Sequence, residues 1–260
     1  MKTMDQVLEQ TQCDFWWLPP DVNSVAREEI AYTHSSRPEK LYNSVVRIQK
    51  DDVRTSALVT EVGNAHTGGP SEWRVAAPSL SDQLERCLEN NGYHLNFECR
   101  AFTICTDAKR PTNSDHIVVR HVQTEQGIID QYAVQDLAFD RQTPLTATEI
   151  AHHLANSTGA EARTHRFVAY DRATGAPLCS ASFNSFPRLG FGFLWGGGTI
   201  PSARGQGAYS AIMTARMRHA HALGLRNVGL YAITTTSAPI VAAQGFEAHG
   251  PVRCWLRPRS

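Results

Sequence analysis

GGGTIPSARGQGAYSAIMTARMRHAHALG, residues 196–224, is the stretch from which the fold is predicted. Its three leading glycines predict a strand that bulges or splays, because residues without a Cβ reach backbone geometries that others avoid. Pro201 ends the strand pairing, a glycine-rich turn follows, and a helix is predicted up to Gly224. The apolar positions of this helix recur every three or four residues and are Ala208, Ala211, Ile212, Ala215, Ala222 and Leu223.

The turn before this helix has the composition of an anion-binding loop. The first turn of a helix carries unpaired N–H groups and the positive end of the helix dipole. Gly205 and Gly207 allow a phosphate to approach the backbone closely, and Arg204 adds a positive charge. From these residues alone the alternative stays open, namely an ordinary strand–turn–helix whose glycines only make the turn.

Two other phosphate-binding loops are excluded by the spacing. A Walker loop needs Gly-Lys-Ser/Thr after its first glycine and four spacers, and the chain has no such run. A dinucleotide-binding fingerprint needs a third glycine where Ser210 stands, and an acidic residue roughly 20 positions later at a strand end. Neither requirement is met, so the loop belongs to another class.

The hexapeptide RGQGAY, residues 204–209, resembles the Gln/Arg-x-x-Gly-x-Gly/Ala signature of the GCN5-related N-acetyltransferases (GNATs). In that family the loop and the helix start hold the pyrophosphate of acetyl-CoA. The predicted order of hairpin, strand, loop, helix, strand and short helix over residues 115–257 also matches, and the departure is a tyrosine at the last signature position. The resemblance implies cofactor contacts by Thr199, Ile200, Arg204, Gly205, Gln206, Gly207, Ala208 and Tyr209.

The resemblance implies an α/β (α+β) fold with a mixed, mostly antiparallel sheet flanked by helices, in a catalytic domain of residues 115–260. Residues 1–110 are predicted to form a smaller, partial domain of the same type, because a strand at Trp73–Ala76 and a helix over 82–90 weakly repeat the order seen near the C-terminus. No glycine loop precedes Trp73, so this half is expected to lack the anion site. Chance similarity between two strand–helix–strand units is the open alternative.

The local patterns of the first half predict helices over 22–31 and 51–62, with a strand over 44–49 between them. The polar stretch 106–116 is predicted to link the two domains.

The implied function is an acetyl-CoA-dependent N-acetyltransferase that moves an acetyl group directly to the amine of a small molecule. In the family a backbone N–H on the splayed strand polarises the thioester carbonyl, and Thr199 and Ile200 occupy that place. The tyrosine that often acts as the acid is replaced by Val241. Tyr231 and Ser237 are the nearest hydroxyls and the catalytic candidates, although a serine at 237 is also typical of a helix N-cap.

The general base is not identified by the sequence. The strand predicted over 190–200 carries no acidic residue. A water chain can serve, or a residue of the helices predicted over 127–139 and 146–156, which line the acceptor pocket in the family. Glu149, His152 and His153 are candidates there, without a ranking.

Two further functions remain open beside acetyl transfer to an amine. One is a non-catalytic module that binds CoA or acyl-CoA, which the valine at 241 favours. The other is a different acyl-CoA reaction on the same fold.

The composition limits which binding partners and which cellular location are expected. Lys and Arg together number 25, as do Asp and Glu, and this zero net charge argues against nucleic acid or an anionic membrane as the main partner. The N-terminus carries no signal-length apolar run, and the six cysteines show no Cys-x-x-Cys pair or zinc spacing. We therefore expect a cytoplasmic protein with free thiols; an oligomer is possible but not readable from these features.

The eleven histidines do not form a recognisable metal motif. The closest pairs are His152 with His153 and His219 with His221, and neighbours at such spacing on a helix do not share a face. No His-Glu-x-x-His run occurs. No metal is therefore expected.

Overall fold

The computed structural model describes residues 2–51, 53–66, 69–108 and 115–258. The chain divides into two compact units. The first comprises Met1–Thr103 together with Tyr231–Ser260, and the second comprises Ile104–Leu230. Part of the predicted linker, residues 109–114, lies outside the described residues.

The first unit contains a mixed sheet in the order β1-β2-β3-β4-β11-β5. Antiparallel pairs join most of these strands, and β3 and β4 run parallel. Its elements are α1 (Met4–Gln12), β1 (Asn23–Ala26), β2 (Ile30–His34), a 3-10 turn (Lys40–Tyr42), β3 (Ser44–Ile48), α2 (Thr55–Ala65), β4 (Ser71–Ala76), α3 (Asp82–Asn90), β5 (His94–Cys105), α7 (Ser237–Ala243) and β11 (Glu247–Arg257).

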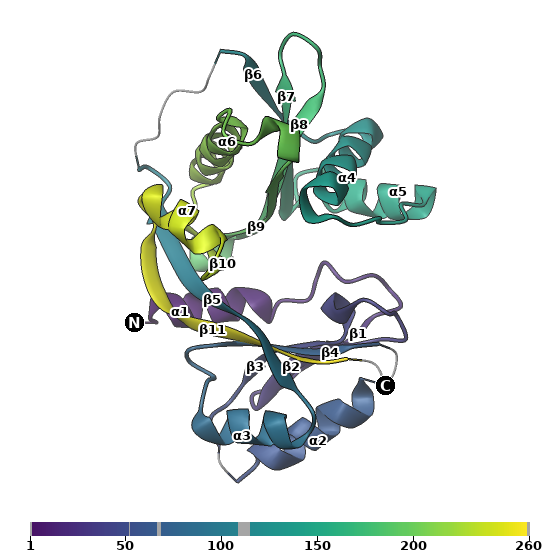
Figure 1. The fold of residues 1–260 in the computed structure, drawn as a ribbon, viewed down its shortest axis with the longest axis vertical. Helices are drawn as coiled ribbons and strands as arrows, with labels where there is room; N and C mark the ends of the chain where they lie inside the picture. The colour runs from purple at the N-terminus through teal and green to yellow at the C-terminus, as the bar shows by residue number, and fades with distance from the viewer. Residues whose placement is uncertain (1, 52, 67–68, 109–114, 259–260) are drawn as a thin grey trace. The chain divides into compact units, whose positions relative to one another are not determined.

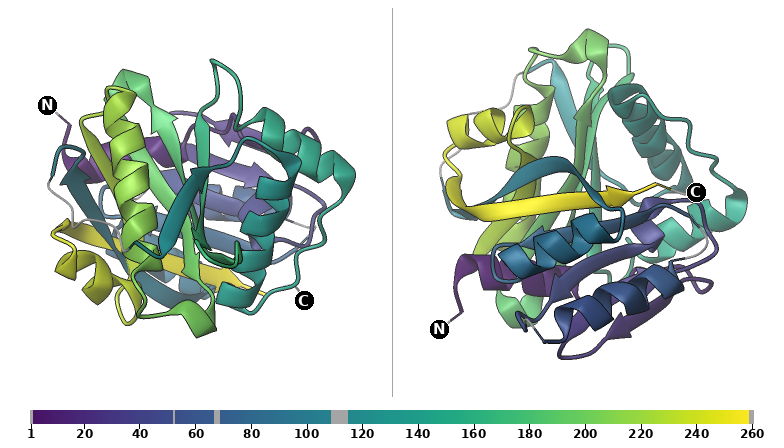
Figure 2. Two further views of the ribbon diagram at one scale, coloured as in Figure 1. Left: turned by 90° about the horizontal axis from the view of Figure 1, so that it is seen from above. Right: turned by 60° about the horizontal axis from the view of Figure 1, so that its bottom comes forward.

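The core of the first unit lies between the sheet and the helices α2 and α3. Trp73 on β4 is fully buried and packs with Val59 of α2 and Leu88 of α3 in one apolar cluster. Figure 2 shows α2 and α3 side by side over one face of the sheet. The helix predicted over 82–90 is observed as α3. Ser81 is its N-cap, and the Ser81 side chain accepts the N–H of Leu84.

The C-terminal strand overturns the predicted assignment of the last residues to the second domain. β11 pairs antiparallel with β4 from Val252 with Ala76 to Arg257 with Ser71, and with β5 on its other side. It is therefore a central strand of the first unit, and Trp255 joins that unit's core. Such pairing between residues far apart in the chain leaves no local signal in the sequence.

The helix predicted over 22–31 is also wrong. These residues form a hairpin in which β1 pairs antiparallel with β2, from Asn23 with His34 to Ala26 with Ala31. β2 is buried along most of its length and pairs with β3 on its other side. Burial within the sheet outweighs a weak local preference for helix.

The second unit has a sheet in the order β10-β9-β8-β7-β6, in which only the β9–β10 pair is parallel. In Figure 1, α4 and α6 cover opposite faces of this sheet. Its elements are β6 (Ile117–His121), α4 (Glu125–Phe139), α5 (Ala147–Ala155), β7 (Thr164–Asp171), β8 (Pro177–Phe186), a 3-10 turn (Pro187–Leu189), β9 (Phe191–Thr199), a 3-10 turn (Pro201–Ala203), α6 (Ala208–Ala222) and β10 (Asn227–Ile233).

The two halves of the chain repeat one order of elements. β3, α2, β4, α3 and β5 follow one another as β9, α6, β10, α7 and β11 do, and each series begins with two parallel strands joined through a helix. The observed class is thus the predicted α/β fold with mixed, mostly antiparallel strands. Among the described residues, no helix combines the length and the apolar character needed to cross a bilayer.

Candidate functional site

A β-bulge interrupts β9 where the three glycines stand. Ser180 of β8 faces Gly198, but two residues further along, Ser182 faces Trp195. Gly196 and Gly197 therefore share one position of the partner strand, and Gly196 has a left-handed φ of 63°. A bulge leaves a residue outside the regular ladder, as the glycine run predicts.

Each glycine of the bulge allows a neighbour to approach closely. A Cβ on Gly198 would lie 2.8 Å from Ala138 Cβ, and one on Gly196 would lie 3.0 Å from Gln135 Nε2, both on α4. A Cβ on Gly197 would lie 3.1 Å from Cε2 of Tyr209, on α6. The bulge is thus held between the end of α4 and the start of α6.

The loop between β9 and α6 presents backbone N–H groups at the start of the helix. Gly205 and Gly207 have positive φ values of 77° and 86°, which glycine adopts at no steric cost. Gly207 is the N-cap of α6 and provides no side-chain cap. The N–H groups of the first turn, which begins at Ala208, are therefore left for a ligand.

Hydrogen bonds to backbone carbonyls hold the two polar side chains of this loop. Arg204 donates from Nε to Thr199 O at 3.3 Å and from Nη2 to Ala138 O at 3.4 Å. Gln206 donates to Ser202 O at 2.9 Å. Both side chains are exposed, so the guanidinium charge stays at the surface beside the helix start.

Thr199 and Ile200, the residues predicted to hold the polarising N–H, lie at the end of β9 and just after it. Thr199 ends β9 opposite Cys179, and its carbonyl accepts from Arg204. The N–H of Ile200 donates to Leu178 O at 3.0 Å. This N–H is engaged in the sheet, whereas the irregular N–H positions lie at Gly196 and Gly197.

Tyr209, the departure from the family signature, points toward the sheet. Its ring lies over Gly197 and near Ala181. Behind it, Arg216 is 1% exposed and donates to Ser182 O at 3.1 Å. Burial lowers the pKa of Arg216, and the neighbouring Tyr209 phenol partly opposes that shift. The tyrosine therefore fills space between α6 and the bulge.

Tyr231 and Ser237 belong to the first unit. Burial, followed by the charge of Glu9, raises the pKa of Tyr231 well above its usual value, which keeps the phenol protonated at neutral pH. Ser237 is the first residue of α7, and its Oγ accepts the N–H of Ile233 at 2.9 Å, so it does not act as the predicted N-cap. Val241 is buried in place of the tyrosine found in the family.

The three candidate bases on α5 have structural partners. Glu149 closes a capping box with Thr146, and His152 lies 3.0 Å from the side-chain amide of Asn156. His153 accepts from Arg166 Nη2 at 3.3 Å and lies 2.6 Å from the Tyr132 hydroxyl. Burial, and then the charge of Arg166, lower the pKa of His153 to about 4, which makes it a weak base.

Arg166 is a buried charge that the sequence analysis did not identify. It is 5% exposed and donates to three neutral acceptors: Ser157 Oγ at 2.9 Å, Gln131 Oε1 at 3.2 Å and His153 Nδ1. Its guanidinium also lies over the Trp195 ring, next to the bulge. A strand arginine carries no local pattern that distinguishes it from a surface residue, so no sequence signal was available.

A hollow of about 970 Å³ lies at the end of α4. The left-handed Asp140 ends that helix, and its N–H donates to Asp136 O. Asp136 also accepts from the backbone and the hydroxyl of Thr143, which shapes the wall. The lining residues are Asp136, Leu137, Asp140, Arg141, Gln142, Thr143 and Pro144.

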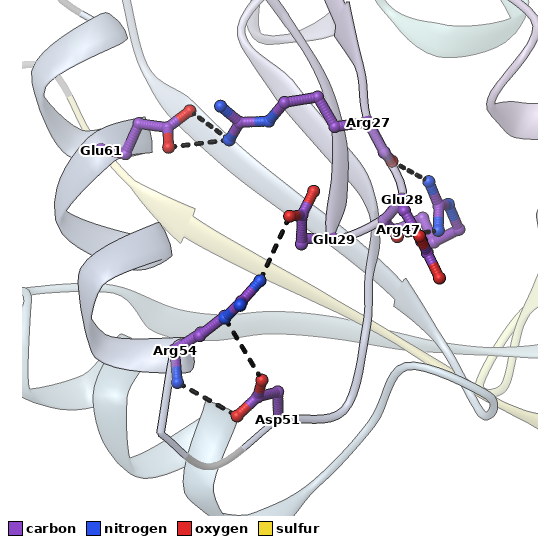
Figure 3. A network of polar contacts seen from close by, with 7 residues as sticks. All are labelled: Arg27, Glu28, Glu29, Arg47, Asp51, Arg54 and Glu61. Carbon is purple, nitrogen blue, oxygen red and sulfur yellow. Dashed lines mark hydrogen bonds and ion pairs between the residues drawn. The ribbon is translucent and has the colours of Figure 1, made fainter.

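The first unit has an ion-pair network where the second has its glycine loop (Figure 3). At the start of α2, Asp51 Oδ1 accepts the N–H of Arg54 at 3.3 Å, and its carboxylate pairs with that guanidinium. Arg54 also pairs with Glu29 at 3.2 Å, and Arg27 pairs with Glu61 at 2.8 Å. The Asp51 carboxylate lies beside the positive end of α2, where its charge disfavours a second anion.

The chain is similar to solved structures, but no protein-family model and no curated protein matches it. Among solved structures, the chain is similar to a GCN5-related N-acetyltransferase from Kribbella flavida, with 12% identity and a TM-score of 0.70 over 97% of this chain and 96% of that one. A second such protein, from Sphaerobacter thermophilus, gives 15% identity and a TM-score of 0.65 over 96% and 85%.

A third solved structure, a tandem GNAT protein from the clavulanic acid biosynthesis pathway, matches with 13% identity and a TM-score of 0.59 over 94% and 85% of the two chains. At these identities the likeness establishes the fold. Together with the repeated order of elements, it identifies this chain as a two-unit protein with the GCN5-related N-acetyltransferase fold.

Proposed function

We propose that the second unit binds acetyl-CoA and that the protein transfers its acetyl group to the amine of a small molecule. The observation that carries this proposal is that the bulge in β9 and the start of α6, whose N-cap is Gly207, lie at the two sides of one short connection. Gly207 and the N–H groups that follow it would bind the pyrophosphate, and Arg204 adds charge beside them. The fold shared with known GNATs supports the same use of this loop.

In this proposal a backbone N–H of the bulge donates a hydrogen bond to the thioester carbonyl and polarises it. A strand that leaves the ladder offers an N–H group without moving the rest of the sheet. Gly196 and Gly197 occupy that position, whereas the Ile200 N–H is already bonded to Leu178. We therefore assign the polarising N–H to the bulge, where a rigid donor is worth several kcal/mol, on the order of 3, in the transition state.

The hollow at the end of α4 is the acceptor side in this proposal. Its lining residues flank Ala138 in the chain, whose carbonyl accepts from Arg204 and whose Cβ would stand 2.8 Å from a Cβ placed on Gly198. Its lining carries the carboxylates of Asp136 and Asp140 and the guanidinium of Arg141, and the net negative balance favours a positively charged amine. Direct transfer then removes two protons from the ammonium nitrogen, one before it attacks the thioester and one as the amide forms. The departing CoA thiolate takes up one proton, with Tyr231 and Ser237 as candidate donors, and one net proton goes to solvent.

The experiment that tests this function measures thiol release. The protein is mixed with acetyl-CoA and a panel of small amines, and CoA binding is measured in parallel by calorimetry. Turnover with at least one amine is expected. CoA binding without turnover on any amine would instead identify a non-catalytic binding module, which Val241 favours. Absence of CoA binding would remove both functions.

A further inference from the structure

We propose that His121, His165 and His219 form a binding site for a divalent transition metal, with Zn²⁺ as the fitting cation. Each ring offers one nitrogen, and these three atoms lie within 4.8 Å of one another. His121 ends β6, His165 lies near the start of β7, and His219 is in the last turn of α6. No short-range spacing relates them, which is why the sequence predicts no metal.

The separation of the nitrogens is close to that of a metal site. Zn–N bonds of about 2.0–2.1 Å place tetrahedral ligand atoms about 3.4 Å apart. His219 Nε2 and His165 Nδ1 are 3.1 Å apart. The rings of His121 and His165 each lie with their centroids 4.7 Å from that of His219. The third nitrogen lies within 4.8 Å of the other two, so the rings must close by about 1 Å or more to bind one cation.

Neighbouring polar groups contact two of the three rings. Ser185 Oγ donates to Arg163 O and accepts from His165 Nε2 at 3.4 Å, which leaves the Nδ1 lone pair of His165 facing His219. The Gln123 side-chain amide lies 3.0 Å from His121 Nδ1. In the part of the chain that the structure describes, the buried Nε2 of His121 has no hydrogen-bond partner. The contact between His165 and Ser185 is of the kind that orients metal-binding imidazoles. At His121 the amide nitrogen of Gln123 faces Nδ1, so binding of a metal through Nε2 requires the amide to turn its oxygen toward a protonated Nδ1.

An opening to solvent reaches the cluster. A hollow of about 440 Å³ is lined by His121 and His219 together with Val119, Phe167, Ala215 and Arg218. It offers an entry path and room for water as a fourth ligand. The charge of Arg218 opposes a cation there, so its removal is expected to strengthen binding.

The donor set selects the class of cation. Three imidazoles suit Zn²⁺ and its neighbours Co²⁺, Ni²⁺ and Cu²⁺, whereas Mg²⁺ and Ca²⁺ take oxygen ligands. His219 lies eleven residues after Ala208 on α6, or about 16 Å along the helix axis. This distance from the glycine loop assigns the metal a structural role, in which it ties β6, β7 and α6 together.

The test is calorimetric titration of the chelator-treated full chain with Zn²⁺, together with visible spectroscopy of the Co²⁺ form. One cation per chain, tetrahedral Co²⁺ bands and a higher melting temperature are expected. His121→Phe and His219→Phe keep ring packing against Phe167 but remove the ligand, and each should weaken binding at least about 100-fold, the upper cost of losing an outer-shell partner. His221→Phe, on the exposed side of the same helix, is the matched control.

Arg218→Gln should bind Zn²⁺ several-fold more tightly than the wild type. Circular dichroism verifies that each variant is folded. If the wild type binds no Zn²⁺, or if folded His121→Phe and His219→Phe variants bind it as the wild type does, the cluster is an aromatic packing element and the proposal is overturned.

Discussion

Gly197 and Tyr209 fit together as a pair, since a Cβ on Gly197 would stand 3.1 Å from Tyr209 Cε2. The family signature has glycine or alanine where this chain has tyrosine. Here the larger side chain is accommodated because the facing strand position has none. The contact joins the first turn of α6 to the bulge of β9, the two features to which the proposed function assigns pyrophosphate and thioester.

Gly197→Ala is expected to lower the free energy of unfolding by about 1–3 kcal/mol, because the added methyl overpacks the Tyr209 ring. Gly197 does not have a positive φ, so the cost is steric. Tyr209→Ala in the same chain should recover most of it. The measurement is urea unfolding of the single and double variants.

Gly198→Ala is the matched control for this pair. Its Cβ would lie 2.8 Å from Ala138 Cβ and 2.9 Å from Phe139 Cζ, on the opposite face of the sheet. Tyr209→Ala should therefore not rescue it. Equal rescue of both alanine variants would show that Tyr209 acts through general loosening of the unit and not through this contact.

The first unit is expected to lose stability in acid through His66. This ring is 4% exposed and lies 2.8 Å from Thr33 O and 2.6 Å from Ser71 Oγ. Burial lowers the pKa of His66 to about 4. The unfolded chain therefore takes up a proton near pH 6.5 that the folded chain does not, and stability falls as the pH drops from about 6.5 to about 4.

The loss assigned to His66 is at most about 3 to 4 kcal/mol, at 1.36 kcal/mol for each unit of the difference between 6.5 and about 4. His66→Gln retains a donor and an acceptor but does not titrate in this range. Urea unfolding at pH 7 and pH 5 should show a smaller pH dependence for this variant than for the wild type. An identical pH dependence would show that other groups account for the acid sensitivity.

Calorimetry should give one CoA per chain. The corresponding helix start of the first unit carries Asp51 and its ion pairs with Arg54 instead of a glycine loop (Figure 3). A carboxylate there repels phosphate. A stoichiometry of two would contradict this reading of the first unit.

Tyr231→Phe tests the phenol as the acid that protonates the departing thiolate. Loss of a general acid commonly lowers kcat by about 100- to 10,000-fold, and CoA affinity should be retained. Ser237→Ala is tested in parallel, and its stability is measured first because its Oγ accepts the Ile233 N–H. If both variants keep nearly full turnover, the proton comes from water or from another residue.

Local chemistry made part of this structure predictable. The glycine run 196–198 predicted the irregular part of β9, and the helix predicted over 82–90 is α3, whose N-cap in the structure is Ser81. Packing between distant segments was not predictable. The strand β11 reads like any C-terminal strand, yet it pairs with β4 in the first unit. The hairpin β1–β2 was mistaken for a helix because β2 is buried in the sheet and the exposed β1 is fixed by its pairing with β2, neither of which is visible in the local sequence.

The candidate site also combines features that the local sequence predicts with features that depend on packing between distant segments. The loop over 204–209 was proposed as the anion site from its own residues, and that role stays a prediction; its Gly205 and Gly207 have positive φ values, as a tight turn before a helix requires. The polarising position was assigned to Thr199 and Ile200, but the hydrogen bond from Ile200 to Leu178 becomes visible only when β8 and β9 are paired. Arg166 and the three clustered histidines depend wholly on which strands lie together.

CoA affinity of Gly207→Asp tests the central claim most directly. Gly207 has φ 86°, and Asp tolerates this conformation better than most residues, so the variant places a carboxylate at the proposed pyrophosphate site. Gly175→Asp, at φ 72° in the β7–β8 turn, matches the backbone cost far from the loop in sequence. Calorimetry should show wild-type affinity for Gly175→Asp and a loss of about tenfold or more for Gly207→Asp. Unchanged CoA affinity in a folded Gly207→Asp variant would contradict the account.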